Sequence, residues 1–176
     1  MGGRFSTKGG QIALGGVLAA GALVMLWLAG VAPSGQLGLT AVGGLFPMAA
    51  TLAAGRAAGY LCWGAAGLLG LILLPDKGTA LLFLVFLGVY PVAKGGIESL
   101  RRLPLEWALK LIFFNLALTL CWFLFRELLW PEPPAWVAGG LPVVYGAGNL
   151  VFIIYDIGLS RLVGMLRARL GARRRG

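Results

Sequence analysis

Histidine is absent from the 176-residue sequence, and charged residues make up only 12% of it. Without histidine the chain cannot form a Ser–His or Cys–His catalytic dyad or a histidine-ligated metal site. The six acidic residues are scattered, and no Walker P-loop occurs, so any ATP-driven step would need another chain. The two cysteines, Cys62 and Cys121, lie in apolar segments and are expected to be small buried hydrophobes. These absences predict no catalytic activity, no cofactor and no metal site.

Apolar residues dominate what is present. Hydrophobic residues make up 59% of the chain, and the mean hydropathy is +0.89. A soluble domain carries about 25% charged residues, roughly twice the fraction found here. The formal net charge is +9. This combination predicts an integral membrane protein with basic flanks in a lipid bilayer, and it argues against a nucleic-acid partner.

Six apolar runs separated by turn residues are predicted to cross the membrane. An open sheet cannot cross lipid, so the runs are expected to be helices of about 20 residues each. The first run, from Ile12 to Ala32, exceeds the roughly 7–15 residues of a signal-peptide core, so we expect it to be retained. The predicted fold class is all-α: a polytopic six-helix transmembrane bundle forming a single domain over residues 1–176. The predicted spans are 11–32, 37–55, 58–75, 79–94, 107–130 and 136–162, followed by a basic tail at 163–176.

The basic residues predict the orientation. If the N-terminus is inside, twelve basic residues lie on the cytoplasmic side, and only Lys77 and Arg126 lie outside. Both termini are therefore predicted to be cytoplasmic, in a multi-pass protein of the cell membrane. The twelve are Arg4, Lys8, Arg56, Lys94, Arg101, Arg102, Arg161, Arg167, Arg169, Arg173, Arg174 and Arg175.

An adjacent acid and base, Asp76 and Lys77, occupy the outer turn between the third and fourth predicted spans. Pro75 ends one helix, and Asp76 near the next N-terminus would complement the helix dipole. One interpretation is a capped turn. The other is that this turn forms part of the mouth of an outward-facing ligand pocket.

Polar and aromatic residues recur at helical spacing on the fifth and sixth predicted spans. Polar residues inside a membrane are costly and are functional candidates by default. Two neighbouring helices with matching stripes could line a ligand cavity, in which Arg126 would bind a carboxylate and Trp122 and Tyr145 would stack a ring. Alternatively, Asn115 and Asn149 could hydrogen-bond across the helix interface as packing contacts. The stripes are Asn115, Thr119, Trp122 and Arg126 on the fifth span, and Tyr145, Asn149, Phe152 and Asp156 on the sixth.

Two further features concern packing. Lys110 and Asp156 have similar predicted depths, and each would be costly as an isolated charge in lipid, so they are predicted to form an ion pair.

On the first span, Gly15 and Gly16 are each followed four positions later by alanine, at Ala19 and Ala20. This small-xxx-small pattern lets another helix approach closely, either within the bundle or from a partner subunit.

Three stretches of the sequence resemble a known family. They are "VAPSGQLGLTAVGGLFPMAA", "GYLCWGAAGLLGLILLPDKG" and "FLGVYPVAKGGIE". Over roughly residues 11 to 120 the chain resembles the substrate-binding S components of energy-coupling factor transporters. It is more similar still to bacterial membrane proteins with the pattern PDK…LLF…G-Y-P…K…IE. The first helix carries mixed Gly and Ala where S components have an alanine motif, and no vitamin-specific signature occurs.

The resemblance implies a function in vitamin or micronutrient uptake. An S component captures a vitamin, a precursor or a metal ion from outside and docks on a transmembrane coupling subunit driven by cytoplasmic ATPases. The resemblance would place the ligand at the outer loops and the two stripes, and the docking face at Gly16 and Ala20. A rival hypothesis is a membrane scaffold or assembly protein, such as the membrane subunit of a cell-shape complex. A small autonomous permease is disfavoured, because no helix is expected to carry an interrupted ion-binding pattern.

Overall fold

The computed structural model describes residues 8–100, 102–124 and 140–173. Within these ranges every regular element is a helix, and six helical segments are long and apolar enough to cross a membrane. The all-helical prediction and the number of candidate spans are thus confirmed for the described residues, which is consistent with a multi-pass membrane protein. The orientation of the termini stays a prediction. The six segments are Lys8–Val31, Gln36–Ala54, Arg56–Leu73, Lys77–Leu100, Leu103–Phe123 and Leu141–Met165.

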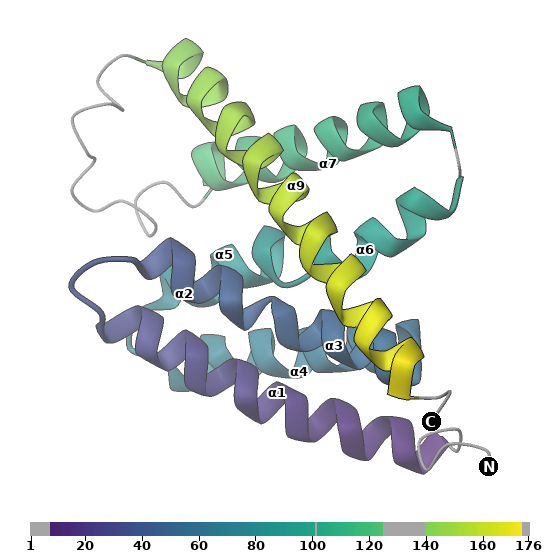
Figure 1. The fold of residues 1–176 in the computed structure, drawn as a ribbon. Helices are drawn as coiled ribbons and strands as arrows, with labels where there is room; N and C mark the ends of the chain where they lie inside the picture. The colour runs from purple at the N-terminus through teal and green to yellow at the C-terminus, as the bar shows by residue number, and fades with distance from the viewer. Residues whose placement is uncertain (1–7, 101, 125–139, 174–176) are drawn as a thin grey trace. The chain divides into compact units, whose positions relative to one another are not determined.

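The chain divides into two compact units, residues 1–131 and 132–176, and each is described by itself (Figure 1). Unit 1 holds the helices α1 to α7. Unit 2 holds the helix α9 (Leu141–Arg173). The prediction of a single domain over the whole chain stays a prediction.

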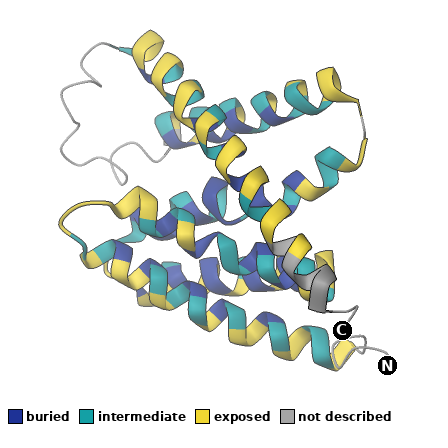
Figure 2. Ribbon diagram, viewed as in Figure 1, coloured by how far each residue is buried: buried dark blue, intermediate teal, exposed yellow. Residues whose placement is uncertain are grey.

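Small residues allow the first helices of unit 1 to pack closely. Helix α1 (Lys8–Val31) packs on α4 (Arg56–Leu73), and both contact α3 (Leu45–Ala54). Buried positions recur every three or four residues along α1, with exposed positions between them. The exposed positions are mostly apolar, as expected for a helix facing lipid (Figure 2). The buried core consists of Ala19, Ala22, Leu26, Ala50, Ala58, Cys62, Ala66, Leu74 and Phe83.

The second span is two helices rather than one. Helix α2 (Gln36–Gly43) ends at Gly44, and α3 begins directly after it. A Cβ atom added to Gly44 would lie 2.0 Å from the carbonyl oxygen of Leu87, far inside van der Waals contact. Glycine is therefore required here because the backbone of the fourth span crosses directly over it.

The fourth span is interrupted near its centre. The amide of Gly88 donates to the carbonyl of Phe83 at 2.8 Å, which is the wide bonding pattern of a π-turn. The carbonyl of Leu84, which Gly88 would have bonded in an α-helix, instead accepts from the indole N–H of Trp63 at 3.2 Å. The fourth span is therefore interrupted by a π-turn, and the expectation that no helix carries an interrupted ion-binding pattern stays a prediction. The segments of the fourth span are α5 (Lys77–Leu82), the π-helix η1 (Phe83–Leu87), α6 (Tyr90–Ile97) and the 3₁₀ turn η2 (Glu98–Leu100).

Three ends of the predicted spans differ from the structure by four residues or more. The fourth span continues past 94 to Leu100, and the next helix, α7 (Leu103–Leu124), begins four residues before the predicted 107. Helix α9 continues past 162 to Arg173, so part of the predicted basic tail is helical. A helix of 33 residues is about 50 Å long at 1.5 Å per residue, which exceeds the roughly 30 Å of a hydrocarbon layer. The helix is therefore longer than one membrane crossing requires.

Candidate functional site

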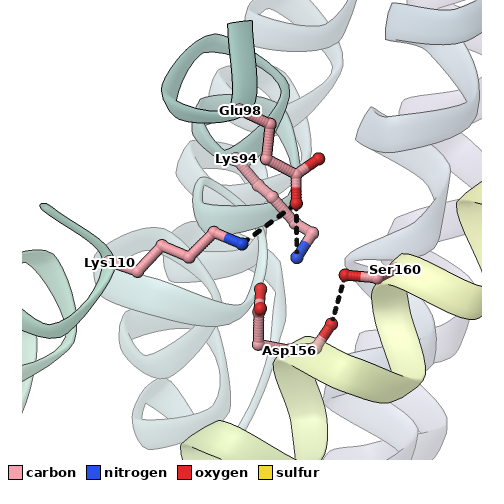
Figure 3. A network of polar contacts seen from close by, with 5 residues as sticks. All are labelled: Lys94, Glu98, Lys110, Asp156 and Ser160. Atoms are coloured by element: carbon pink, nitrogen blue, oxygen red, sulfur yellow. Dashed lines mark hydrogen bonds and ion pairs between the residues drawn. The ribbon is translucent and has the colours of Figure 1, made fainter. Parts of the chain in front are cut away.

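Two buried lysines share one carboxylate in unit 1. Lys94 on α6 and Lys110 on α7 place their Nζ atoms 2.9 Å and 3.0 Å from the same Oε1 of Glu98 (Figure 3). The two lysine side chains are only 2% and 6% exposed, whereas that of Glu98 is 32% exposed. We call these three residues the lysine–glutamate cluster. Taking each ammonium out of water costs several kcal/mol, and the shared carboxylate offsets part of that cost for both lysines.

Aromatic rings border the lysine–glutamate cluster. Tyr90, one helical turn before Lys94, is fully buried and stacks on Phe86 at 5.2 Å between ring centroids. Phe113 of α7 lies 5.8 Å from the Tyr90 ring. The Nζ of Lys110 also lies 5.4 Å from the ring centre of Trp107, within range of a cation–π contact. Of these rings, Trp107 directly contacts a member of the cluster, Lys110.

Sequence reasoning missed two members of this site. Lys94 was used only for orientation, and Glu98 was quoted only within the "KGGIE" stretch. The spacing of four between a lysine and a glutamate at a helix end was the available signal, because such residues face each other on a helix. Nothing in the sequence indicated that Lys110 from the next helix would contact the same oxygen.

The predicted partner of Lys110 was Asp156. Lys110 pairs with Glu98 inside unit 1. Asp156 belongs to unit 2, where its backbone carbonyl accepts a hydrogen bond from Ser160 Oγ at 2.9 Å (Figure 3). The Lys110–Asp156 pair joins two separately described units and stays a prediction.

The Asp76–Lys77 turn is capped at both sides. The carboxylate of Asp76 accepts from the backbone N–H groups of Gly78 at 2.9 Å and Thr79 at 3.3 Å, so it is the N-cap of α5. The Nζ of Lys77 donates to two carbonyl oxygens at the end of α4, at 2.7 and 3.2 Å. The amide of Gln36 donates to Asp76 and to Thr79 Oγ1. The capped-turn interpretation is confirmed, and a role in ligand binding stays a prediction.

The polar residues of the two stripes bond to their own helices. The Asn115 amide and the Thr119 hydroxyl each donate to the carbonyl oxygen four residues earlier, at 2.8 and 2.6 Å. Asn149 makes the same contact to Tyr145 at 2.8 Å. Such back-bonding satisfies part of each side chain's hydrogen-bonding capacity within one helix.

The other residues of the two stripes are aromatic or charged. Trp122 and Tyr145 are half-buried, on α7 and α9 respectively, and Phe152 is buried. Arg126 lies outside the described residues. Because α7 and α9 belong to different units, a cavity shared by the two stripes stays a prediction.

The small residues of α1 fall on two different faces. Gly15 and Ala19 are buried, and a Cβ added to Gly15 would lie 3.3 Å from the carbonyl oxygen of Ala58 on α4. Gly16 and Ala20 are exposed, and a Cβ at Gly16 would meet nothing within 4 Å. The first pair is thus an internal packing face, and only the second pair stays available for the predicted docking.

Comparison with protein-family models, with curated proteins and with solved structures found no match for this chain. The resemblance to S components stays a prediction that rests on the stretches quoted above. What the chain does has to be argued from its own residues.

Proposed function

We propose that this chain is a membrane-embedded subunit that captures a small polar or anionic molecule, in the manner of a vitamin or micronutrient uptake system. The molecule would enter from the outer side, towards the Asp76–Lys77 turn and the two polar stripes. The chain would have no catalytic activity of its own and would rely on a transmembrane coupling subunit and cytoplasmic ATPases. What supports the docking step is that Gly16 and Ala20 face outward from α1.

The observation that carries the proposal is the interrupted fourth span. A π-turn gives up regular helical bonding inside an apolar segment, which is costly where water cannot replace the lost bonds. The π-turn lies against Gly44, where the two helices of the second span meet, and the same span ends in the lysine–glutamate cluster. In membrane transport proteins, interrupted helices supply polar groups for solute binding within the bilayer. A protein that only packed against partners would have no evident need for this arrangement.

The proposal is tested by native mass spectrometry of the intact protein purified in mild detergent. We expect one small molecule to be carried through purification and released on activation in the gas phase. Trp122→Leu should reduce the bound fraction, because it removes a half-buried ring from the predicted ligand stripe. Phe123→Leu is the matched control, because Phe123 is 65% exposed, lies outside the predicted stripe and should leave retention unchanged.

The scaffold hypothesis makes the opposite prediction. A folded preparation without any bound small molecule, together with equal behaviour of the two variants, would favour an assembly protein. Tight retention of a second protein chain in that preparation would strengthen the scaffold interpretation.

A further inference from the structure

Two spans of unit 1 change from one helix to the next at the same four-residue pattern. The stretch "GLFP" at 44–47 lies where α2 ends and α3 begins, and "GVYP" at 88–91 lies where η1 ends and α6 begins. In each, a glycine is followed by an aliphatic residue, an aromatic residue and a proline. The two junctions also touch, because a Cβ atom added to Gly44 would lie 2.0 Å from the carbonyl oxygen of Leu87.

The prolines make both junctions easier to bend. A proline has no amide hydrogen, so Pro47 cannot donate to the carbonyl of Gly43, four residues earlier. Pro91 likewise cannot donate to the carbonyl of Leu87. Inside a bilayer a helical hydrogen bond is costly to break, because water cannot replace it. Bending at the two junctions avoids part of this cost, and prolines and π-turns are common sites of helix bends.

The helices on each side of the junctions pack in pairs. Helix α2 contacts α5, and α3 contacts α6. The amide of Gln36, the first residue of α2, donates to the Asp76 carboxylate and, at 2.7 Å, to the hydroxyl of Thr79 on α5. We call α2 and α5 the Asp76 half, and α3 and α6 the cluster half, because α6 carries Lys94 of the lysine–glutamate cluster.

We propose that the two junctions are paired hinges, about which the Asp76 half moves as one body relative to the cluster half. A hinge in one span alone would pull α2 away from α5, whereas two hinges that touch let both helices turn together. Gln36 ties the two helices of the moving half to each other. Hinge motions of this kind open and close the ends of proteins around ligands, and here they would act at the end that carries the Asp76–Lys77 turn. The inference concerns motion within unit 1 and does not depend on the solute-capture proposal.

The experiment measures distances between pairs of spin labels by electron paramagnetic resonance on the full chain in lipid nanodiscs. Cys62 and Cys121 are first replaced by alanine, so that only introduced cysteines carry a label. Ile112 on α7 is the reference position, because it is 64% exposed and α7 is joined to the cluster half through the Lys110–Glu98 contact. Labels at Ile112 and at Leu37 on α2, which is 63% exposed, should give two distances.

A second label pair tests whether α2 and α5 move together. Labels at Leu37 on α2 and Leu81 on α5 should give one distance, because both helices belong to the Asp76 half. Gln36→Leu removes both hydrogen bonds of the tie, so the Leu37–Leu81 pair should then give two distances.

Proline variants test the hinges themselves. Pro47→Ala and Pro91→Ala each supply an amide hydrogen that can extend the helix across a junction, and together they should merge the two Leu37–Ile112 distances into one. Pro104→Ala is the matched control, because Pro104 is the second residue of α7, where a missing amide hydrogen interrupts no helical bond. This control should keep both distances.

Three results would overturn the proposal. A single Leu37–Ile112 distance with both hinge prolines present would show that the two halves do not move. Two Leu37–Leu81 distances with Gln36 present would show that α2 and α5 move separately. Two Leu37–Ile112 distances in the double proline variant, still folded by circular dichroism, would place the movement outside the two junctions.

Discussion

Replacing Glu98 by glutamine removes a carboxylate that both buried lysines contact. Glutamine keeps the shape and leaves an acceptor oxygen, but it cannot neutralise two ammonium groups held 2.9 and 3.0 Å away. Breaking a buried ion pair costs about 3–5 kcal/mol. We expect the lower end, about 3 kcal/mol, because the Glu98 side chain is 32% exposed and water screens part of the loss.

The assay is thermal unfolding of purified protein in detergent, followed by circular dichroism. A loss of about 3 kcal/mol corresponds to a fall in Tm of about 6–12 °C for a chain of this size. Glu106→Gln is the matched control: Glu106 lies in the first turn of α7, where its loss should cost about 0.3–1 kcal/mol through the helix dipole. Equal shifts in the two variants would refute the claim that the lysine–glutamate cluster stabilises unit 1.

Four further outcomes are expected. Gly44→Ala should lower the free energy of unfolding by about 3 kcal/mol, because its methyl group meets the carbonyl oxygen of Leu87 at 2.0 Å. Trp63→Phe should cost about 1 kcal/mol and speed amide hydrogen exchange in η1, because it removes the indole hydrogen bond to the π-turn. Neutralising Lys110 and Asp156 together should cost less than the sum of the single changes in a double-mutant cycle. Cysteine at Asp76 should be labelled from outside intact cells by an impermeant reagent.

Each outcome has a result that counts against it. Gly38→Ala, at a position where a Cβ meets nothing within 4 Å, is the control for Gly44→Ala and should change stability little. Unaltered exchange in η1 would show that Trp63 does not hold the π-turn. Strictly additive losses would argue against the Lys110–Asp156 pair. Labelling of the introduced cysteine only after permeabilisation would reverse the predicted orientation.

The spans could be predicted because length and apolarity are properties of the sequence itself. A run of about 20 apolar residues bounded by Pro, Gly and charged residues has few structural alternatives. The interruption of the fourth span could not be predicted in this way. The stretch "FLVFLG" is uniformly apolar, and the carbonyl that the π-turn releases is bonded by Trp63, twenty-one residues away. Close packing at Gly44 likewise depends on a distant segment of backbone.

The candidate site was predicted in part. Lys110 was identified as a buried charge that needs a partner, because burial depth follows from position along a helix. Its contact with Glu98 depends on how α6 and α7 are rotated and spaced, which one sequence does not specify. Similarly, the spacing of Asn115 and Thr119 identified a polar stripe. It could not show that both side chains also bond to their own helix.

The central claim, that the chain captures a small molecule, is tested most directly by ligand-dependent unfolding of the purified protein in lipid nanodiscs. A panel of vitamins and vitamin precursors would be added one at a time. We predict that one compound raises the unfolding midpoint in a concentration-dependent way. At one hundred times its Kd, it should add about 2.7 kcal/mol to the free energy of unfolding. No shift with any compound, in protein that unfolds cooperatively and co-purifies with a second protein chain, would contradict the account and favour a scaffold.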